Sequence, residues 1–213
     1  MGYFITFEGI EGCGKTTQIR MAGEFLSAQG MPVIVTEEPG GTVLGAELRR
    51  ILLNRATFDF CKEAELFLFL ADRAQHVKET IRPALRDGKW VLCDRFSDAT
   101  IAYQGFGREM DPDFVRRMCD FSSGALKPDM TLLFDLPVDV GLRRALERAS
   151  RIENAPLEDR FEREALTFHE KVREGYLYLA RKEPERFRVI DGGKAVMDVH
   201  REVSFHLSKW SKK

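Results

Sequence analysis

The sequence predicts an α/β fold in which a five-stranded parallel sheet carries helices on both faces. Short apolar runs alternate with longer segments whose apolar residues have helical spacing. The short runs are too uniformly apolar for a sheet with one face in water, which favours parallel strands buried between helices. A chain of 213 residues with 44% hydrophobic content is long enough for one sizeable core. We therefore expect residues 1–213 to form a single domain.

Five apolar runs bounded by turn residues are expected as the strands. In chain order they are Tyr3–Glu8, Pro32–Glu37, Trp90–Asp94, Met130–Asp135 and Phe187–Asp191. Helices are expected between them, because apolar residues recur at helical spacing. Examples are Ile19, Ala22, Phe25 and Leu26 after the first strand, and Val138, Leu142, Ala145 and Leu146 after the fourth.

Two polar stretches interrupt this alternation. Arg148–Arg160 (RASRIENAPLEDR) contains a proline and no apolar periodicity, so we expect a mobile excursion between two helices. Thr36–Thr42 (TEEPGGT) follows the second expected strand and contains a Pro-Gly-Gly turn. Either could be an ordinary surface loop. Their placement, after a strand and between helices, favours a functional role.

Charge and cysteine content narrow the class of protein. The 33 basic residues nearly cancel the 34 acidic ones, so we expect neither a nucleic-acid nor a membrane partner. The four cysteines show no C-x-x-C pairing, which is typical of reduced thiols in a cytoplasmic protein. No apolar run approaches the length of a membrane span.

The stretch GIEGCGKT, Gly9–Thr16, fits the pattern G-x-x-x-x-G-K-[ST]. It lies between an expected strand and an expected helix, where backbone N–H groups can surround a phosphate. Lys15 would reach the terminal phosphates of a nucleoside triphosphate, and the Thr16 hydroxyl would bind Mg²⁺. A glycine-rich turn without nucleotide is the weaker alternative. The residues expected to contact the nucleotide are Gly9, Ile10, Glu11, Gly12, Cys13, Gly14, Lys15, Thr16 and Thr17.

Two further motifs carry arginines. Asp94 and Arg95 lie at the carboxyl end of the third expected strand, where ligands of open α/β sheets bind. Asp94 suits the Mg²⁺ shell, through water, and Arg95 suits a phosphate, although the two could instead form a local ion pair. In LFLFLADRAQ, Phe69 and Arg73 are four residues apart and share a helix face, where they could stack on a base and bind its edge. The alternative is a core helix with an exposed arginine, and we interpret Phe67 as a core residue.

The segments FEGIEGCGKTT, EPGGT, LADRAQ, CDRF and AYQGFGR, in this order and spacing, resemble the bacterial thymidylate kinases. The resemblance runs from Tyr3 to about Glu202. It implies a P-loop nucleoside monophosphate kinase fold with a mobile lid, at about residues 148–160 here. It also implies ATP-dependent phosphorylation of dTMP to dTDP in dTTP biosynthesis, Mg²⁺ dependence and a homodimer.

The resemblance assigns roles residue by residue. Phe69 matches the aromatic residue that stacks on thymine, and Arg73 matches the arginine that hydrogen-bonds the base. Glu11 matches a residue that faces the sugar of the acceptor. The residues expected to bind dTMP are Glu11, Glu38, Arg49, Phe69, Arg73, Arg95, Thr100, Tyr103 and Gln104. The residues expected to act on the transferred phosphoryl group are Lys15 and Arg95, with Arg148, Arg151 and Arg160 as candidates from the lid.

Departures from the family pattern leave the fine selectivity open. Glu37 stands where the family often has an arginine, and Ala99 removes a hydroxyl found in related sequences.

Two other functions compete with a dTMP kinase. A deoxynucleoside kinase would phosphorylate thymidine rather than dTMP, and a nucleotide-sensing module would bind ATP without transferring phosphate. The chain has no N-K-x-D segment, which a guanine-reading GTPase would need.

Overall fold

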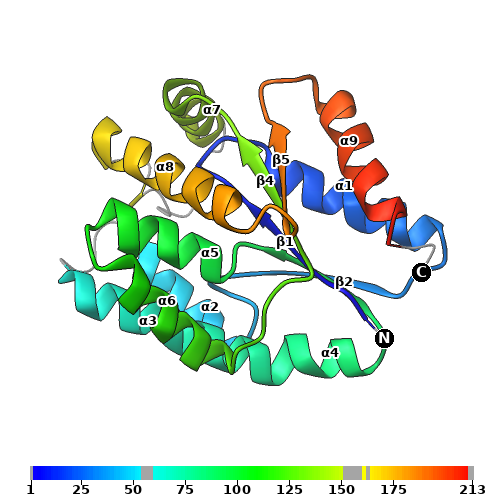
Figure 1. Ribbon diagram of the computed structural model, residues 1–213, viewed down its shortest axis with the longest axis horizontal. Coiled ribbons are helices and arrows are strands. Elements are labelled where there is room, and N and C mark those ends of the chain that lie inside the picture. The colour runs from blue at the N-terminus through cyan, green and yellow to red at the C-terminus, as the bar shows by residue number, and fades with distance from the viewer. Residues whose placement is uncertain (1, 54–59, 151–159, 162–163, 211–213) are drawn as a thin grey trace.

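Five parallel strands form one sheet at the centre of the protein (Figure 1). The computed structural model describes residues 2–53, 60–150, 160–161 and 164–210, with the backbone alone for 148–150. The strands are β1 (Phe4–Glu8), β2 (Val33–Glu37), β3 (Trp90–Asp94), β4 (Met130–Asp135) and β5 (Phe187–Asp191). Each begins within one residue of its expected start and ends where expected, because buried parallel strands read as short, continuous apolar runs.

The spatial order of the strands is β2-β3-β1-β4-β5, with every neighbouring pair parallel. The chain therefore moves to one side of β1 for β2 and β3, and to the other side for β4 and β5. The register places Phe7 beside Asp94 and Glu8 beside Leu133. This reversal of strand order opens the crevice in which α/β sheets bind ligands, at the carboxyl end of β1.

Helices cover both faces of the sheet, which confirms the expected fold class. Figure 1 shows α1 and α9 together on one face, whereas α3, α4, α5, α6 and α8 lie on the other. The helices are α1 (Lys15–Ala28), α2 (Val43–Leu53), α3 (Lys62–His76), α4 (Arg82–Arg86), α5 (Ser97–Thr100), α6 (Pro112–Ser123), α7 (Val138–Ser150), α8 (Leu166–Lys182) and α9 (Val196–Ser208). Two π-helical segments, η1 (Val77–Ile81) and η2 (Ile101–Gly107), continue α3 and α5. Such segments are rare and often occur at functional sites.

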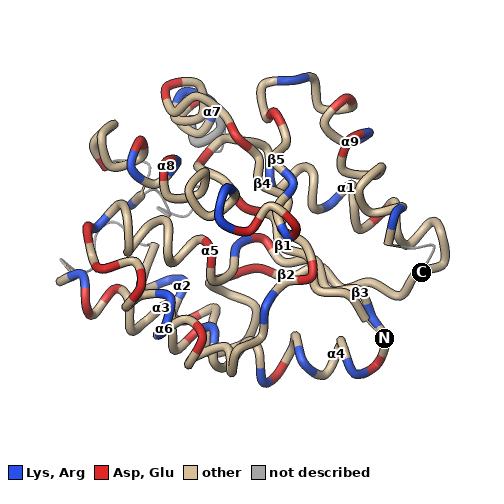
Figure 2. Tube along the Cα trace, in the orientation of Figure 1, with Lys and Arg blue, Asp and Glu red and all other residues tan. Residues whose placement is uncertain are grey.

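The core lies between these layers and includes β1 on both of its faces. Phe4, Ile5 and Phe7 are at most 1% exposed. Phe7 stacks on Phe134 of β4, with ring centroids 5.8 Å apart. Charged residues of both signs are interspersed along the helices (Figure 2), in keeping with the balanced composition. No helix among the described residues is long and apolar enough to cross a membrane.

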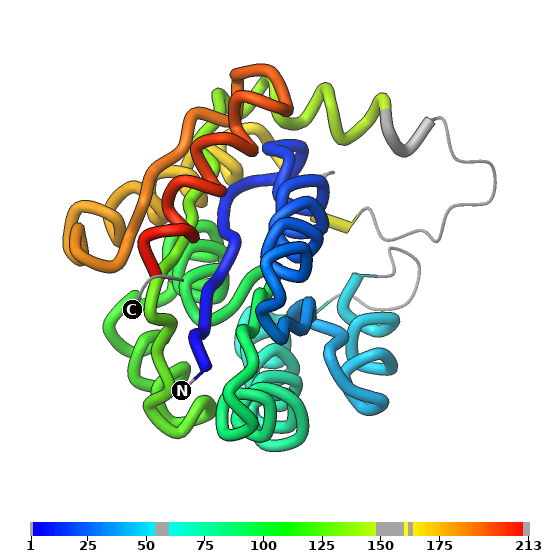
Figure 3. Tube along the Cα trace, turned by 90° about the vertical axis from the view of Figure 1, so that its right-hand side faces the viewer, coloured from blue at the N-terminus to red at the C-terminus, as the bar shows by residue number. Residues whose placement is uncertain are grey.

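Two expectations about individual elements are wrong. Phe67, interpreted as a core residue, is 55% exposed, because it lies on the outer face of α3. Arg148–Ser150, expected in the excursion, continue α7, since arginine, alanine and serine are all tolerated in a helix. The remainder of the expected lid up to residue 159 lies outside the described residues. In Figure 3, α7 extends toward the same side of the molecule as α2.

Candidate active site

The glycine-rich loop connects β1 to α1 at the carboxyl end of the central strand. Gly9, Gly12 and Gly14 have φ angles of 140°, 69° and 96°, which L side chains rarely adopt. A Cβ atom at Gly12 would also overlap the carbonyl of Gly141. The loop ends at Lys15, the first residue of α1, so the free N–H groups of the first helical turn face the crevice. This geometry is that of a phosphate-binding loop.

Lys15 is held within this loop. Its Nζ donates hydrogen bonds of 2.9 Å to the carbonyl oxygens of Gly9 and Ile10, and the residue is only 7% exposed. A buried ammonium group needs such partners, because its desolvation is costly. Phosphate oxygens are also hydrogen-bond acceptors and could replace these carbonyls as partners of Lys15.

Thr16 and Asp94 meet at the same edge of the sheet. The Thr16 hydroxyl donates to Asp94 Oδ2 at 3.4 Å. The other carboxylate oxygen, Oδ1, is buried and has no hydrogen-bond partner among the described residues. A hydroxyl and a carboxylate oxygen are the ligand types that Mg²⁺ prefers. These two residues therefore fit the magnesium site expected from the sequence.

Arg95 and Glu11 form an ion pair across the mouth of the loop. Arg95 has a φ of 69°, a strained value for a residue with a side chain, of the kind that clusters at functional sites. Its Nη2 donates to Glu11 Oε1 at 3.0 Å, and its Nη1 donates to the Gly9 carbonyl at 3.2 Å. The Tyr103 hydroxyl also donates to Glu11 Oε1, while the Tyr103 ring lies 4.8 Å from the Arg95 guanidinium carbon. We call Glu11, Arg95 and Tyr103 the acceptor clamp, after the role expected of them from the sequence.

Glu11 is negatively charged within this clamp. Burial alone would raise the pKa of its carboxyl group, but a contact with His169 opposes this effect. The positive charges of Arg95 and Lys15 act in the same direction, and the pKa is held well below its usual range. Glu11 is thus an ionised hydrogen-bond acceptor at every physiological pH.

A second buried cluster surrounds Arg73. The residue is 2% exposed, and its Nε donates to Glu38 Oε2 at 2.9 Å. Its Nη2 donates to the Thr100 hydroxyl at 2.9 Å. Glu38 Oε1 lies 2.9 Å from His76 Nδ1, so both carboxylate oxygens are engaged. Phe69, one turn before Arg73 on α3, is half-buried, and the cluster is therefore fixed in place beside an aromatic surface.

The remaining expected acceptor residues, Arg49 and Gln104, have hydrogen-bond partners of their own. Arg49 on α2 donates from Nη1 to Glu37 Oε2 at 2.9 Å and to the Pro39 carbonyl at 2.8 Å. Gln104, on η2, donates from Nε2 to Glu65 Oε1 at 2.7 Å. Glu37 thus supplies a negative partner to Arg49. The family often has a second arginine at the position of Glu37.

Of the three expected lid arginines, the structure describes the side chain of Arg160 alone. Its guanidinium group pairs with the buried carboxylate of Glu65 and stacks over the Phe161 ring at 4.7 Å. Arg148 lies in the last turn of α7 and its side chain is outside the described part, as is the whole of Arg151.

Comparisons with known proteins agree with this geometry. The family model for thymidylate kinase matches residues 7–203. The chain belongs to the thymidylate kinase family. The thymidylate kinase of Syntrophus aciditrophicus is 56% identical over 97% of this chain and 94% of its own length. That of Geobacter sulfurreducens is 55% identical over 92% of both chains. A crystal structure of thymidylate kinase from Ehrlichia chaffeensis superposes with a TM-score of 0.76 and 33% identity, over 97% of this chain and 98% of that one.

Some neighbours of this thymidylate kinase site were not expected from the sequence. Tyr176 of α8 accepts a hydrogen bond from Arg95 Nη1 at 3.1 Å and donates one to Glu8 Oε2 at 2.9 Å. His169 of the same helix lies beside Glu11, and Glu65 of α3 lies beside Gln104. His169 and Tyr176 are two helical turns apart in FHEKVREGY, and this spacing alone could have placed them on one face of α8.

Proposed function

We propose that the protein transfers the γ-phosphoryl group of ATP to dTMP, giving dTDP for dTTP biosynthesis. One observation carries the proposal beyond family membership: the carbonyl of Gly9 accepts hydrogen bonds from both Lys15 and Arg95. Lys15 belongs to the triphosphate loop, whereas Arg95 belongs to the acceptor clamp. The cations for the two substrates therefore meet at one atom, which suits transfer between two phosphates.

On the donor side, the loop amides and Lys15 bind the phosphates of ATP. Lys15 leaves its two carbonyl partners for the terminal phosphates, where it stabilises the charge that develops during transfer. Mg²⁺ would be held by Thr16 and by Asp94, through water. When bound, it neutralises phosphate charge and fixes the geometry of the triphosphate.

On the acceptor side, the cluster around Arg73 binds the base of dTMP, and the acceptor clamp binds its sugar and phosphate. Phe69 stacks on thymine, and Arg73, Thr100 and Gln104 read the edge of the base. Because Glu38 occupies one side of the Arg73 guanidinium group, the arginine is pre-oriented and loses little entropy on binding.

The clamp holds the rest of the acceptor. Tyr103 lies against the deoxyribose, where a 2′-hydroxyl would intrude, and Glu11 faces the 3′-hydroxyl. Arg95 and Arg49 bind the monophosphate, for which a planar guanidinium group offers paired donors. The lid arginines, Arg148, Arg151 and Arg160, complete the positive surroundings when the lid closes over ATP.

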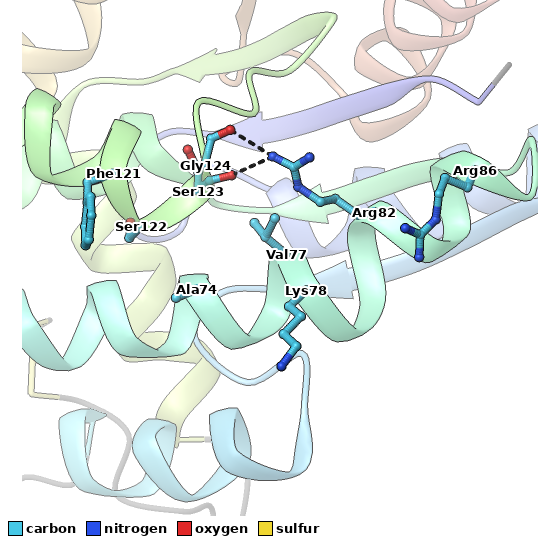
Figure 4. A pocket seen from close by; sticks show the side chains of 9 residues that line it. All are labelled: Ala74, Val77, Lys78, Arg82, Arg86, Phe121, Ser122, Ser123 and Gly124. Atoms are coloured by element: carbon cyan, nitrogen blue, oxygen red, sulfur yellow. Dashed lines mark hydrogen bonds between the residues drawn. The ribbon is translucent and has the colours of Figure 1, made fainter.

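We also infer a homodimer, formed through α3 and α6. Three phenylalanines are exposed on these neighbouring helices: Phe67 (55%), Phe114 (40%) and Phe121 (84%). Ala71 and Ala74 extend the exposed apolar stripe of α3. An open hollow of about 570 Å³ adjoins this face (Figure 4). Arg82 closes one side of it by donating to the carbonyl oxygens of Ser123 and Gly124.

Cysteine chemistry bears on the compartment. All four cysteines are free thiols, and three of them, Cys13, Cys93 and Cys119, are buried. Burial raises the pKa of the Cys93 thiol well above its usual value, so this thiol is unreactive. Reduced thiols suit a cytoplasmic enzyme, which is where we place the reaction.

A panel of acceptors tests the proposed function. ADP release from ATP is measured with dTMP, dUMP, dAMP, dGMP and thymidine in turn. We expect turnover with dTMP in clear preference to the other monophosphates and none with thymidine. Turnover with thymidine but not dTMP would instead identify a deoxynucleoside kinase, and ATP binding without any acceptor-dependent turnover would identify a nucleotide-sensing module.

Lys15→Ala provides the matched control for this assay. The substitution removes the cation that stabilises developing charge, so kcat should fall by roughly a hundredfold or more. The dTMP affinity, measured by calorimetry without ATP, should fall much less than kcat, because Lys15 acts on the acceptor clamp only through its charge and the shared Gly9 carbonyl. Equal losses of both would place Lys15 in the acceptor site and contradict the division of roles.

A further inference from the structure

Two buried polar groups face each other beside the acceptor clamp. Glu11 Oε2 and both ring nitrogens of His169 have no hydrogen-bond partner among the described residues. The distance between Oε2 and His169 Nδ1 is 3.4 Å, close enough for an ion pair but without an aligned hydrogen bond. The His169 side chain is 0% exposed, and that of Glu11 is 9% exposed. Buried polar atoms are nearly always paired, so two that face each other point to a shared role.

The carboxylate of Glu11 is anchored through one oxygen only. Arg95 and Tyr103 both donate to Oε1. Contacts on a single oxygen leave the carboxylate plane able to rotate about that oxygen, which moves Oε2. A donor at Oε2 would fix the plane, and His169 Nδ1 is the nitrogen that lies nearest to it.

Helix α8 brings His169 to this position together with Tyr176. The two residues are two turns apart, so they lie on the same face of the helix. Tyr176 contacts Arg95, and His169 contacts Glu11, so one helix face supports both members of the ion pair. The Tyr176 hydroxyl makes two hydrogen bonds, whereas the ring nitrogens of His169 have no hydrogen-bond partner in the part of the chain that the structure describes.

We propose that His169 is a positioning residue for the acceptor: a small rotation of the Glu11 carboxylate about Oε1 aligns Oε2 with His169 Nδ1–H, and the resulting hydrogen bond orients the carboxylate toward the sugar of the acceptor nucleotide. This inference rests on the proposed function, in which Glu11 faces the 3′-hydroxyl. Glu11 is ionised, and an imidazole ring can present a proton on Nδ1 to such an acceptor. A residue that only filled the core would need no nitrogen at this position.

Three substitutions of His169 distinguish a positioning role from a role in filling the core. Two of them place an amide nitrogen at different points of the ring, and the third has no nitrogen. In His169→Asn the amide nitrogen can take the place of Nδ1, in His169→Gln it takes the place of Nε2, and His169→Leu has neither. We expect His169→Leu to raise KM for dTMP about tenfold, the usual scale for one lost hydrogen bond to a charged group, with KM for ATP within about twofold. His169→Asn should recover most of this loss, and His169→Gln much less.

His200→Asn is the matched control, because His200 lies on α9 and its Nε2 contacts Ser204 instead of the acceptor clamp. It should leave both KM values unchanged. Melting temperatures of all variants report on folding. If His169→Leu does not fold, the comparison of Asn with Gln still decides. Equal behaviour of Asn and Gln, or an equal rise of KM for ATP, would overturn the proposal.

A double-mutant cycle with Glu11→Gln shows whether His169 acts through Glu11. In the Glu11→Gln background, His169→Leu should have little further effect on KM for dTMP. Independent, multiplying effects would overturn the positioning role while leaving the proposed function intact. No effect of Glu11→Gln alone on dTMP use would overturn the placement of the acceptor sugar, and the inference with it.

Discussion

Glu37 places a negative charge at the rim of the acceptor site. Its carboxylate accepts a hydrogen bond from Arg49, the residue assigned to the monophosphate. Both side chains are partly in water, at 51% and 28% exposure, so the pair is worth at most about 1 kcal/mol. A monophosphate bound as proposed would compete with Glu37 for the Arg49 guanidinium group. Glu37 stands where the family often has an arginine, so this site lacks one cation. Glu37 also pairs with a second cation, Arg49.

Glu37→Gln is expected to lower KM for dTMP by about threefold, the scale set by a partly exposed ion pair, because Arg49 no longer leaves a charged partner. Steady-state kinetics with varied dTMP measure the change. Glu47→Gln is the control. Glu47 pairs with Arg50 on the exposed side of α2, the helix that carries Arg49. A rise in KM for Glu37→Gln would mean that Glu37 orients Arg49 for the phosphate.

Arg73→Ala should affect both binding and stability. It removes the proposed contact with the base and leaves Glu38 as a buried carboxylate without its arginine partner. We expect dTMP affinity to fall at least tenfold and the free energy of unfolding to fall by about 3 kcal/mol. Calorimetry and denaturant unfolding measure the two losses. The double variant Arg73→Ala/Glu38→Leu should recover stability but not binding, and an unchanged dTMP affinity in Arg73→Ala would contradict the base-reading role.

Among the elements, β1 and α8 are joined by a buried carboxyl group. Glu8 of β1 accepts hydrogen bonds from the backbone N–H of Phe96 at 2.7 Å and from the Tyr176 hydroxyl at 2.9 Å. Burial, and then the nearby Asp98 carboxylate, raises the pKa of Glu8 to about 8. Glu8 is therefore largely protonated at neutral pH, and α8 is held to the sheet by a neutral group.

This pKa gives a pH dependence of stability with a definite sign. The folded protein keeps the Glu8 proton between about pH 4.5 and pH 8, whereas the unfolded chain has lost it. Since the native state then binds more protons than the unfolded state, the stabilising contribution falls as the pH rises through this window. Glu8→Gln removes the titration and keeps a neutral side chain.

The measurement is the difference in unfolding free energy between the parent protein and Glu8→Gln at several pH values. We expect this difference to shift in favour of the variant from about pH 5 to pH 8 and to level off above it. Other titrating groups cancel in the difference. A constant difference across this window would show that Glu8 is ionised in the folded protein.

At the scale of the whole molecule, the apolar face on α3 and α6 predicts the oligomeric state. Phe121→Asp places a charge on the most exposed phenylalanine of that face and should convert the proposed dimer to monomers. Light scattering after size-exclusion chromatography measures the mass, which should halve. Phe205→Asp on α9 is the control, because Phe205 is 58% exposed on the opposite face of the sheet. Dissociation by Phe205→Asp instead would place the interface on α9.

The sequence predicted the fold and the phosphate loop because both depend on local patterns. Strand ends, the glycines of the loop and the Asp94–Arg95 turn are each encoded within a few residues. The outward position of Phe67 was missed, because helical spacing does not say which apolar residues a partner covers. The π-helical segment η2 was also missed, since its residues do not differ in composition from those of an α-helix.

The supporting residues of the site were harder to predict. These residues contact the expected site residues from elements that are far apart in the chain, as in the hydrogen bond between Tyr176 and Glu8. They are Glu8, Glu65, His169 and Tyr176. Local periodicity marks them only as inward-facing. Which buried polar groups then face each other is decided by the packing of α8 and α3 against the sheet, which no single segment of sequence encodes.

The carbonyl oxygen of Gly9 has a thermodynamic consequence. Because Lys15 and Arg95 both donate to it, a triphosphate that draws Lys15 away leaves this oxygen wholly to Arg95 and changes the field at the acceptor clamp. The two substrates then bind with a coupling free energy, and this coupling is reciprocal. Whatever factor ATP applies to the affinity for dTMP, dTMP applies to the affinity for ATP.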